Sequence, residues 1–256
     1  MKNNTTETNW NNVAHWYDSY LKGDDTYQAK VIAPNLARML SVSEGNRVLD
    51  VACGQGYFAR LIADTGAIVV GVDSATELVE IAARQAEHNE SYRVGDAEKL
   101  SAMKLGTFDA VFSVLAFENI KNISKVLEGM NDCLKKEGKV VLVLLHPAFR
   151  IPQHSDWGYD MKRNVQYRKT EKYLSEVSIP IELAPHSRGG KKEVTTTFHR
   201  SLQWYMKAFR NAGFAIANLE EWISHKKSDA GPRQVAEDNA RKEIPMFMAI
   251  ELRKIT

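Results

Sequence analysis

The sequence predicts an α/β protein built on a mostly parallel, doubly wound sheet. Two observations predict this class: short apolar runs alternate with helix-length segments, and a glycine-rich turn follows the first run. Strands that alternate with helices form βαβ units, whose parallel strands are covered on both faces. A chain of 256 residues, 44% of them hydrophobic, can bury a full core around such a sheet.

Five strands are expected first, at residues 47–53, 68–72, 91–94, 108–115 and 139–145. Helices are expected between them at 57–63, 75–87, 97–103 and 123–136, the last closed by Gly138. The alternation stops after residue 145 and resumes with a helix at 202–212, ended by Gly213, and strands at 214–222 and 246–252. The sheet is therefore expected to have seven strands and to be completed after an insertion.

We expect one domain with four parts: N-terminal lid helices (1–40), a ligand-binding core (41–146), a substrate cap inserted after the fifth strand (147–198) and the completion of the sheet (199–256). In the cap, "KYLSEVSIPIEL" and "EVTTTFHR", joined through "HSRGGKK", are expected to form a hairpin over the cleft.

Composition and charge indicate which partners and which cellular compartment to expect. A net charge of +2 is too mild to imply nucleic acid, and two cysteines, Cys53 and Cys133, suit a reducing compartment. The N-terminus is polar, unlike a signal peptide, and the longest apolar run, Val140 to Leu145, is too short to span a bilayer. No group of acids and histidines has metal-ligand spacing. We expect a cytoplasmic protein without a metal or a membrane partner.

The glycine-rich turn, "GQGYFA", follows a strand that carries Asp50, and the next two strands end in Asp73 and Asp96. Such a turn lets the backbone approach a ligand at the carboxyl ends of the strands. Asp73 can accept hydrogen bonds from ribose hydroxyls and Asp96 from an adenine amine. Since acids beside the turn would repel a pyrophosphate, the charges favour a sulfonium cofactor with an amino-acid tail over a dinucleotide.

Four motifs in order carry a family resemblance: "VLDVACGQGYFA", "GVDSATELVEIAA", "GDAEKL" and "FDAVFSVLAFENI", followed by "LKKEGKVVLVLLHP". They resemble the class I S-adenosylmethionine-dependent methyltransferases of the small-molecule type, similar to methyltransferase domains 11 and 25. The resemblance covers residues 9–139 closely and the last strands loosely. It implies a Rossmann-like sheet with an antiparallel last strand, S-adenosylmethionine as cofactor and S-adenosylhomocysteine as product.

The resemblance also implies the cofactor-binding residues: Asp50, Cys53, Gly54 and Gly56 for the methionine tail, Asp73 for the ribose, Ser74, Asp96 and Ala97 for the adenine, and Ser113 and Leu115 under the sulfonium. In-line methyl transfer needs mainly proximity and orientation, with a base only where the nucleophile must lose a proton early. The candidates for catalysis are His146, His199 and the lid residue Tyr17.

The acceptor pocket is expected from the segments after the fourth and fifth strands and from the cap. Its candidates are Glu118, Asn119, Arg150, Trp157, Tyr167, Arg168 and Arg200. Because arginine forks match carboxylates and phosphates, we predict a small acceptor with an acidic group, methylated on O, N or S. The alternative is that these arginines are structural and never meet the substrate.

Two other functions stay open. One is methylation of RNA or protein through the basic cap, although "SVLAFENI" lacks the Asn/Asp-Pro-Pro-aromatic signature of enzymes that methylate base amino groups. The other is a nucleotide- or S-adenosylmethionine-binding protein without catalysis. The sequence leaves the acceptor open, and a monomer and a homodimer are equally compatible with it.

Overall fold

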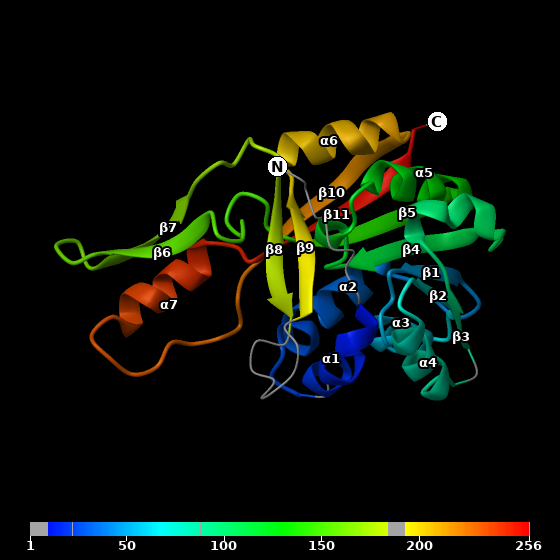
Figure 1. The fold of residues 1–256 in the computed structure, drawn as a ribbon, viewed down its shortest axis with the longest axis horizontal. Coiled ribbons are helices and arrows are strands. Elements are labelled where there is room, and N and C mark those ends of the chain that lie inside the picture. The colour runs from blue at the N-terminus through cyan, green and yellow to red at the C-terminus, as the bar shows by residue number, and fades with distance from the viewer. Residues whose placement is uncertain (1–9, 22, 88, 184–192, 256) are drawn as a thin grey trace.

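The computed structural model describes residues 10–21, 23–87, 89–183 and 193–255. A sheet of seven strands crosses the molecule in the order β10-β11-β5-β4-β1-β2-β3 (Figure 1). Its parallel strands are β1 (Arg47–Val51), β2 (Ile68–Asp73), β3 (Glu90–Val94), β4 (Phe108–Val114) and β5 (Leu134–Leu145). Strand β11 (Phe247–Lys254) runs antiparallel between β5 and β10 (Phe214–Trp222). The predicted fold class is confirmed.

Both faces of the sheet are covered, as its continuous apolar runs require. Along β5, Val140, Leu142 and Leu144 enter one core cluster, while Val141 and Val143 enter the other. The first cluster includes η3 (Ala97–Met103), α5 (Ile123–Cys133) and α6 (Leu202–Asn211). The second includes α2 (Ala33–Leu40) and α3 (Tyr57–Ala63).

Five further helical segments precede α7 in the chain: η1 (Trp10–Val13), α1 (Ala14–Leu21), η2 (Gln28–Ile32), α4 (Thr76–Arg84) and η4 (Phe117–Asn119). Of the segments expected as lid helices, η1 and α1 stay outside these two core clusters, whereas η2 joins the second through Val31 and Ile32. Helix α2 packs into the core beneath the sheet, because its Leu36 and Leu40 are fully buried.

Helix α5 ends earlier than its apolar spacing predicts. It stops at Cys133, Leu134 is extended, and β5 already includes Gly138. A Cβ at residue 138 would lie 2.6 Å from Leu134 Cδ1 and 2.9 Å from the carbonyl oxygen of Asp109. The prediction that Gly138 caps the helix is therefore wrong, since this glycine permits close packing within the sheet. Gly213, with φ +80°, does follow α6 as predicted.

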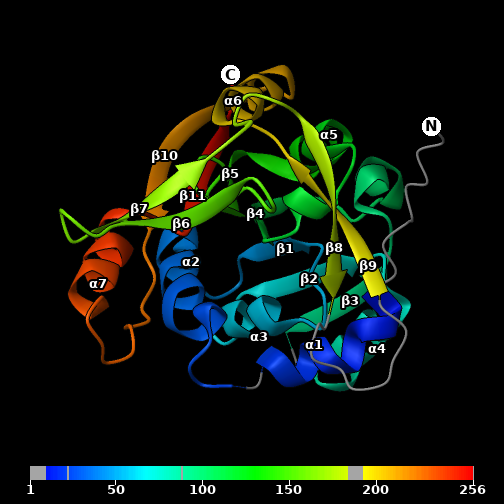
Figure 2. The ribbon, with the colours of Figure 1, turned by 60° about the vertical axis from the view of Figure 1, so that its left-hand side comes forward.

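Two hairpins follow β5. The expected pairing of β8 (Val177–Leu183) with β9 (Glu193–His199) is confirmed, and the joining residues 184–192 lie outside the described part of the chain. The hairpin of β6 (Ser155–Asp160) and β7 (Val165–Thr170) was not predicted. Figures 1 and 2 show β8–β9 beside α1, and β6–β7 at the opposite side with α7 (Gln234–Glu243).

Helix α7 was not predicted from the sequence, because it buries only Ala236 and Ala240 along its length and so has little apolar periodicity.

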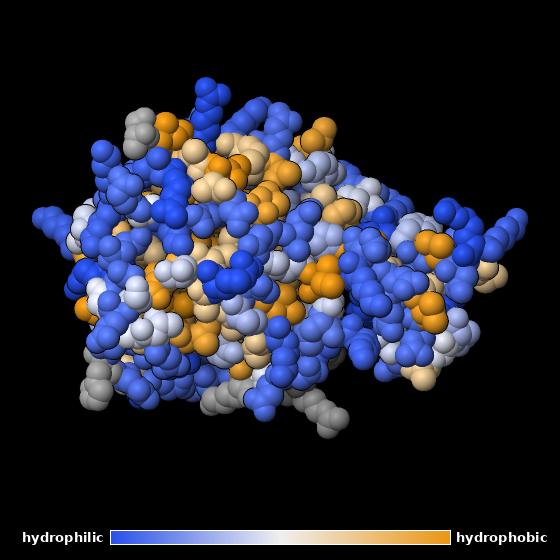
Figure 3. All heavy atoms as spheres, turned by 180° about the vertical axis from the view of Figure 1, so that it is seen from behind, coloured by the Kyte–Doolittle hydropathy of each residue, from blue (hydrophilic) through white to orange (hydrophobic). Residues whose placement is uncertain are grey.

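On the face seen in Figure 3, hydrophilic side chains predominate and apolar ones form small separate groups. Among the described residues, none of the helices has the length and apolar character needed to cross a bilayer.

Candidate functional site

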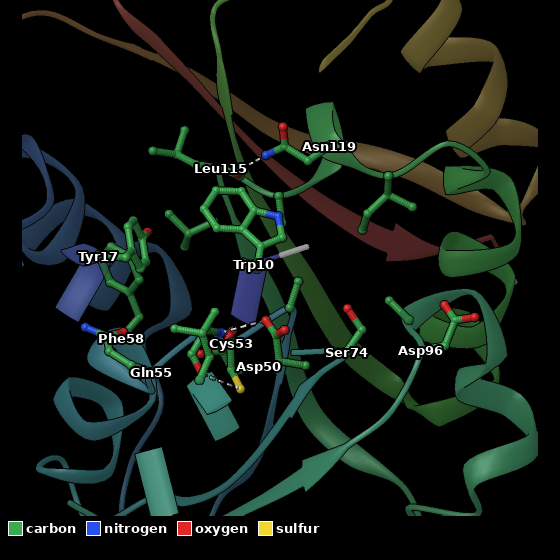
Figure 4. A pocket seen from close by; sticks show the side chains of 18 of the residues that line it. Trp10, Tyr17, Asp50, Cys53, Gln55, Phe58, Ser74, Asp96, Leu115 and Asn119 are labelled. Atoms are coloured by element: carbon green, nitrogen blue, oxygen red, sulfur yellow. Dashed lines mark hydrogen bonds between the residues drawn. The ribbon is translucent and has the colours of Figure 1, made fainter. Parts of the chain in front are cut away.

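A cavity of about 500 Å³ opens at the carboxyl ends of β1, β2 and β4. This position is the switch point of the strand order, where open α/β sheets bind ligands. Five parts of the chain line it: the loop after β1, the ends of β2 and β3, the segment after β4, the lid η1–α1 and strand β9. Figure 4 shows Tyr17, Gln55 and Phe58 at one end and Ser74 and Asp96 at the other.

The loop after β1 takes its shape from left-handed backbone conformations at Ala52, Gly54 and Gly56, with φ of +61°, +56° and +81°. Gly56 precedes α3, and a Cβ there would lie 2.5 Å from the hydroxyl of Tyr92. Of the predicted loop residues, Cys53 and Gly54 line the cavity, whereas Gly56 does not. Gly56 acts by letting the chain turn beneath the tyrosine.

Asp73, at the end of β2, fixes this loop. Its Oδ2 accepts the amide N–H of Gly54 at 2.8 Å, and its Oδ1 accepts that of Ala75, also at 2.8 Å. The carboxylate lines the cavity beside Ser74 and joins the glycine loop to the start of α4. Burial raises its pKa, and the backbone donors act in the opposite direction.

Asp50 lies at the floor of the same wall and is only 2% exposed. Its Oδ2 is buried and has no hydrogen-bond partner. Burial, and then the charge of Asp73, raise the pKa of this carboxyl well above its usual value. An orphaned carboxylate oxygen in a cavity is a site for a positively charged donor, so the pair fits the ammonium and sulfonium charges of S-adenosylmethionine.

The third acid, Asp96, lines the cavity together with Ala97 and Glu98. Its Oδ1 accepts the amide N–H of Glu98 at 2.9 Å and caps η3, and its other oxygen lies 3.5 Å from Lys99. Asp96 therefore stands at the same cavity edge as Asp73 with capacity to accept a further hydrogen bond.

The lid contributes Trp10, Tyr17 and Leu21 to the cavity. Trp10 and Tyr17 meet edge to face at 5.8 Å, and Tyr17 lies over the glycine loop. The lid is attached to α4, because Asn11 Oδ1 accepts the amide N–H of Glu77 at 2.9 Å. Tyr17 is the one proposed catalytic residue that lines the cavity.

The opposite wall comes from the segment after β4 and from β9. It is lined by Val114, Leu115, Ala116, Asn119, Ile120, Lys121, Thr196 and Phe198. The amide of Asn119 donates to the carbonyl of Leu115 at 3.4 Å and accepts from Thr197 Oγ1 at 3.2 Å, which joins the β8–β9 hairpin to this segment. Ser113 is 1% exposed and does not reach the cavity, and its Oγ has no partner.

Arg200, predicted to bind substrate, is buried behind this wall. Its guanidinium donates to the carbonyls of Phe117 at 3.0 Å and of Ile120 and Lys121 at 2.8 Å. It lies against the rings of Phe198 and Trp204. Arg200 thus holds the wall in place and does not line the cavity.

Glu118 turns away from the cavity toward the same region, with its Oε2 buried and unpartnered. Burial raises the pKa of Glu118 to about 7, while backbone N–H groups and the charge of Arg200 act to lower it. The prediction that Glu118 contacts substrate is not supported by this position. Asn119, its neighbour, does line the cavity.

The cap residues Arg150, Trp157, Tyr167 and Arg168 also lie away from the cavity lining. They belong to the turn after β5 and to the β6–β7 hairpin, where Tyr167 packs over Gly158. Figures 1 and 2 show the β6–β7 hairpin beside α7, apart from the β8–β9 hairpin that contributes to the cavity.

The two histidines do not line the cavity either. His146 Nδ1 accepts the amide N–H of Ala148 at 3.2 Å, so Nε2 carries the proton and donates to Glu221 at 2.7 Å. His199 Nε2 donates to the carbonyl of Tyr173 at 2.8 Å. Burial lowers the pKa of both. Both side chains therefore bond to other groups of the protein outside the cavity lining.

Several lining residues were not predicted, notably Gln55, Tyr57, Phe58, Lys121, Thr196 and Phe198. The first three lie directly at or after the glycine turn, and this position in the sequence could have predicted that they line the cavity. Thr196 and Phe198 alternate along β9, and only the packing of the hairpin reveals which face of that strand meets the cavity. No group of residues arranged to hold a metal ion occurs in the described ranges.

A family model described as a methyltransferase domain matches residues 49–142. A ubiquinone biosynthesis O-methyltransferase of Xanthomonas axonopodis pv. citri (strain 306) is 33% identical over 139 residues, covering 51% of this chain and 56% of that protein. The chain thus spans about half the length of the curated relatives it matches.

Two solved structures show the same fold. An S-adenosylmethionine-dependent methyltransferase from Mesorhizobium loti has a TM-score of 0.66 at 23% identity, over 90% of this chain and 99% of that one. A complex of DhpI with SAH has a TM-score of 0.61 at 16% identity, over 96% and 93%. Residues 49–142 thus match a methyltransferase domain, and the chain shares its fold with solved S-adenosylmethionine-dependent methyltransferases.

Proposed function

We propose that this protein transfers the methyl group of S-adenosylmethionine to a small, largely apolar molecule. The observation that carries the proposal is the division of one cavity into two kinds of wall. Asp50, Asp73 and Asp96 stand along one wall, and the other is mainly apolar, formed by aliphatic side chains and Phe198 with Asn119, Lys121 and Thr196 among them. The first wall suits a cationic cofactor and the second suits a flat apolar acceptor.

On the cofactor wall, each acid has a separate task. Asp50 Oδ2, buried and unpartnered, accepts from the ammonium of the methionine tail. Asp73, already holding Gly54 and Ala75, offers its remaining lone pairs to the ribose hydroxyls. Asp96 accepts from the adenine amine, near Ser74 and Ala97. The bound cofactor supplies a methyl carbon activated by the adjacent positive sulfur.

On the acceptor wall, Val114, Leu115, Ile120 and Phe198 give apolar surface. Lys121 is the only basic residue among the described residues that line the cavity. The arginines that suggested an acidic acceptor all lie elsewhere, so an uncharged acceptor fits this cavity better than an acid. Because the acceptor shares about 500 Å³ with the cofactor, it must be small.

The chain promotes the reaction chiefly by orientation and by exclusion of water. The lid residues Trp10 and Tyr17 and the hairpin residues Thr196 and Phe198 enclose the cavity from two sides. Held between them, the acceptor atom can approach the methyl carbon in line. Tyr17 is the polar lid group that we propose to orient the acceptor, and neither His146 nor His199 is needed.

The similarity to a ubiquinone biosynthesis O-methyltransferase supports oxygen as the acceptor atom. The test is a screen with methyl-labelled S-adenosylmethionine against matched sets of neutral phenols, aromatic acids, amines, thiols and total RNA. We expect turnover with a neutral phenol or another uncharged aromatic compound. Turnover of RNA alone, or of acids in preference to their neutral analogues, would contradict the proposal.

A further inference from the structure

Three arginines gather outside the cofactor cavity, between the β6–β7 hairpin, the turn after β5 and helix α7. Arg150 and Arg168 both lie against the indole of Trp157, with their Cζ atoms 5.5 and 5.1 Å from the ring centroid. Arg241, on α7, is near enough for its charge to act on Arg150. None of the three lines the cofactor cavity, so the cluster is a separate feature of the molecule.

The three guanidiniums differ in how well they are satisfied. Arg168 donates to the carbonyl of Phe149 at 2.7 Å and to Ser155 Oγ at 2.7 Å, so it is held by the hairpin itself. Arg241 makes one hydrogen bond, from Nε to Ser228 Oγ at 3.2 Å. Arg150 is half-buried, and its Nε is fully buried without a hydrogen-bond partner.

No carboxylate in the described part of the chain forms an ion pair with Arg150, Arg168 or Arg241. The charge of Asp156 acts on Arg168 without forming an ion pair, and Glu221 is bound to His146. Burial, followed by the charges of Arg168 and Arg241, lowers the pKa of Arg150 to about 10. A buried cation beside two like charges is costly unless an anion offsets them.

An approach to the cluster exists from the outside. A hollow of about 390 Å³ lies between residues 227–234 and α7, and Arg241, Lys227 and Arg233 are among its lining residues. Arg241 therefore lines a hollow that opens to solvent, which Asp229 and Glu237 also line. Contact with Trp157 accounts for the packing of Arg150 and Arg168, but a ring face cannot accept the in-plane hydrogen bonds of the Arg150 fork.

We propose that Arg150, Arg168 and Arg241 form a second binding site, for a compact oxyanion such as a phosphate or carboxylate group. The planar forks of Arg150 and Arg241 would donate to its oxygens, as arginines do to such groups. Arg168, fixed by the hairpin, would add charge without moving. This site does not depend on the methyl-transfer reaction proposed above.

Calorimetric titration of the full chain with inorganic phosphate tests the site, with chloride at equal ionic strength as the reference. We expect phosphate, and not chloride, to bind with one site per chain and to raise the melting temperature. Arg150→Gln and Arg241→Gln should each weaken phosphate binding by about tenfold or more. Arg163→Gln, at the exposed tip of the hairpin, removes the same charge and should change the affinity by less than about twofold.

Affinity for S-adenosylhomocysteine separates this site from the cofactor cavity and checks that the variants fold. It should be unchanged in all three variants. Equal effects of phosphate and chloride, unaltered phosphate affinity in both Arg150→Gln and Arg241→Gln, or competition between phosphate and S-adenosylhomocysteine would overturn the proposal. Glycerol 3-phosphate binding more tightly than phosphate would support a phosphate carried on a larger molecule, and weaker binding would support the free ion.

Discussion

Asp73 and Gly54 are joined by a 2.8 Å hydrogen bond from the glycine amide to the carboxylate, across 19 positions of sequence. This bond ties the end of β2 to the loop after β1, and the second oxygen of Asp73 ties both to the start of α4. Since β1 and β2 already pair up to Val51 and Val72, these bonds extend the paired region into the glycine loop and fix one wall of the cavity.

Replacing Asp73 tests that wall. We expect Asp73→Ala to weaken S-adenosylhomocysteine binding by roughly 1–3 kcal/mol, because the amide of Gly54 loses its acceptor and the cofactor ribose loses its partner. Asp73→Asn keeps one acceptor oxygen and should lose less. Calorimetry on both variants measures the difference, and equal affinity in Asp73→Ala and the unaltered protein would show that the wall holds without this carboxylate.

Asp50→Asn should have opposite effects on the two states of the protein. Without cofactor, the buried carboxylate of Asp50 is unfavourable when ionised, so its removal should raise the melting temperature. With cofactor, the ammonium loses its ionic partner, so affinity should fall. Thermal denaturation with and without S-adenosylhomocysteine measures both effects, and Asp64→Asn, at an exposed acid outside the cavity lining, is the matched control.

The same carboxylates give the apoprotein a defined pH dependence. Asp50 and Asp73 both have raised pKa values in the folded state, so between the unfolded value and the folded value the folded protein binds more protons. Their contribution to stability therefore grows as pH falls through the folded pKa and levels off near 3.8, the unfolded value. In Asp50→Asn this acid-side gain should shrink. A melting temperature series in which the unaltered protein and the variant run parallel would contradict the assignment.

Arg200→Lys should affect the acceptor wall of the cavity and leave the cofactor wall unchanged. Arg200 holds the segment after β4 through three carbonyl oxygens, and a lysine ammonium cannot reach all three from one position. We expect a stability loss of roughly 2–4 kcal/mol and a raised acceptor KM, with S-adenosylhomocysteine affinity nearly unchanged. Arg163→Lys, exposed at the hairpin tip, is the control. A cofactor affinity that falls as steeply as the acceptor affinity would show that Arg200 supports both walls.

The residues of the cofactor wall could be predicted from the sequence, because the order of the parallel strands determines where they lie. The ends of β1, β2 and β3 meet at one edge in any parallel sheet of this order, so Asp50, Asp73 and Asp96 could be located from their strands alone. The acceptor wall depends on how inserted segments fold. The β6–β7 hairpin carries Arg150's partner Trp157 away from the cavity, and only that packing separates Arg150 from the acceptor.

The predicted end of helix α5 was wrong for a related reason. The apolar spacing of Val126, Leu127, Met130 and Leu134 is helical, yet Leu134 is extended and already pairs with Phe108 of β4. A long-range strand contact outweighs local propensity at this residue. The partners of Arg200 could not be predicted either. Its charge suggested that it binds a ligand, but its guanidinium donates to three backbone carbonyls.

The histidines provide a test of the reaction itself. His146→Gln should lower the melting temperature, since the bonds to Glu221 and Ala148 are lost or weakened. The pH dependence of kcat/KM should nevertheless match that of the unaltered protein, because His146 does not line the cavity. A pH limb that disappears in the variant would assign the catalytic base to His146 after all.

The lid residue Trp10 gives the last test, because it lines the cavity while packing edge to face on Tyr17 at 5.8 Å. Trp10→Ala removes this contact and opens the cavity to water, so kcat should fall by about tenfold or more as orientation and water exclusion weaken. Trp16→Ala, one and a half turns along the lid and 39% exposed, removes an equal side chain that does not line the cavity and should retain turnover. Steady-state kinetics measure kcat for both variants, and circular dichroism verifies that both are folded. Equal activity in Trp10→Ala and Trp16→Ala would mean that η1 and α1 cover the cavity without taking part in the transfer.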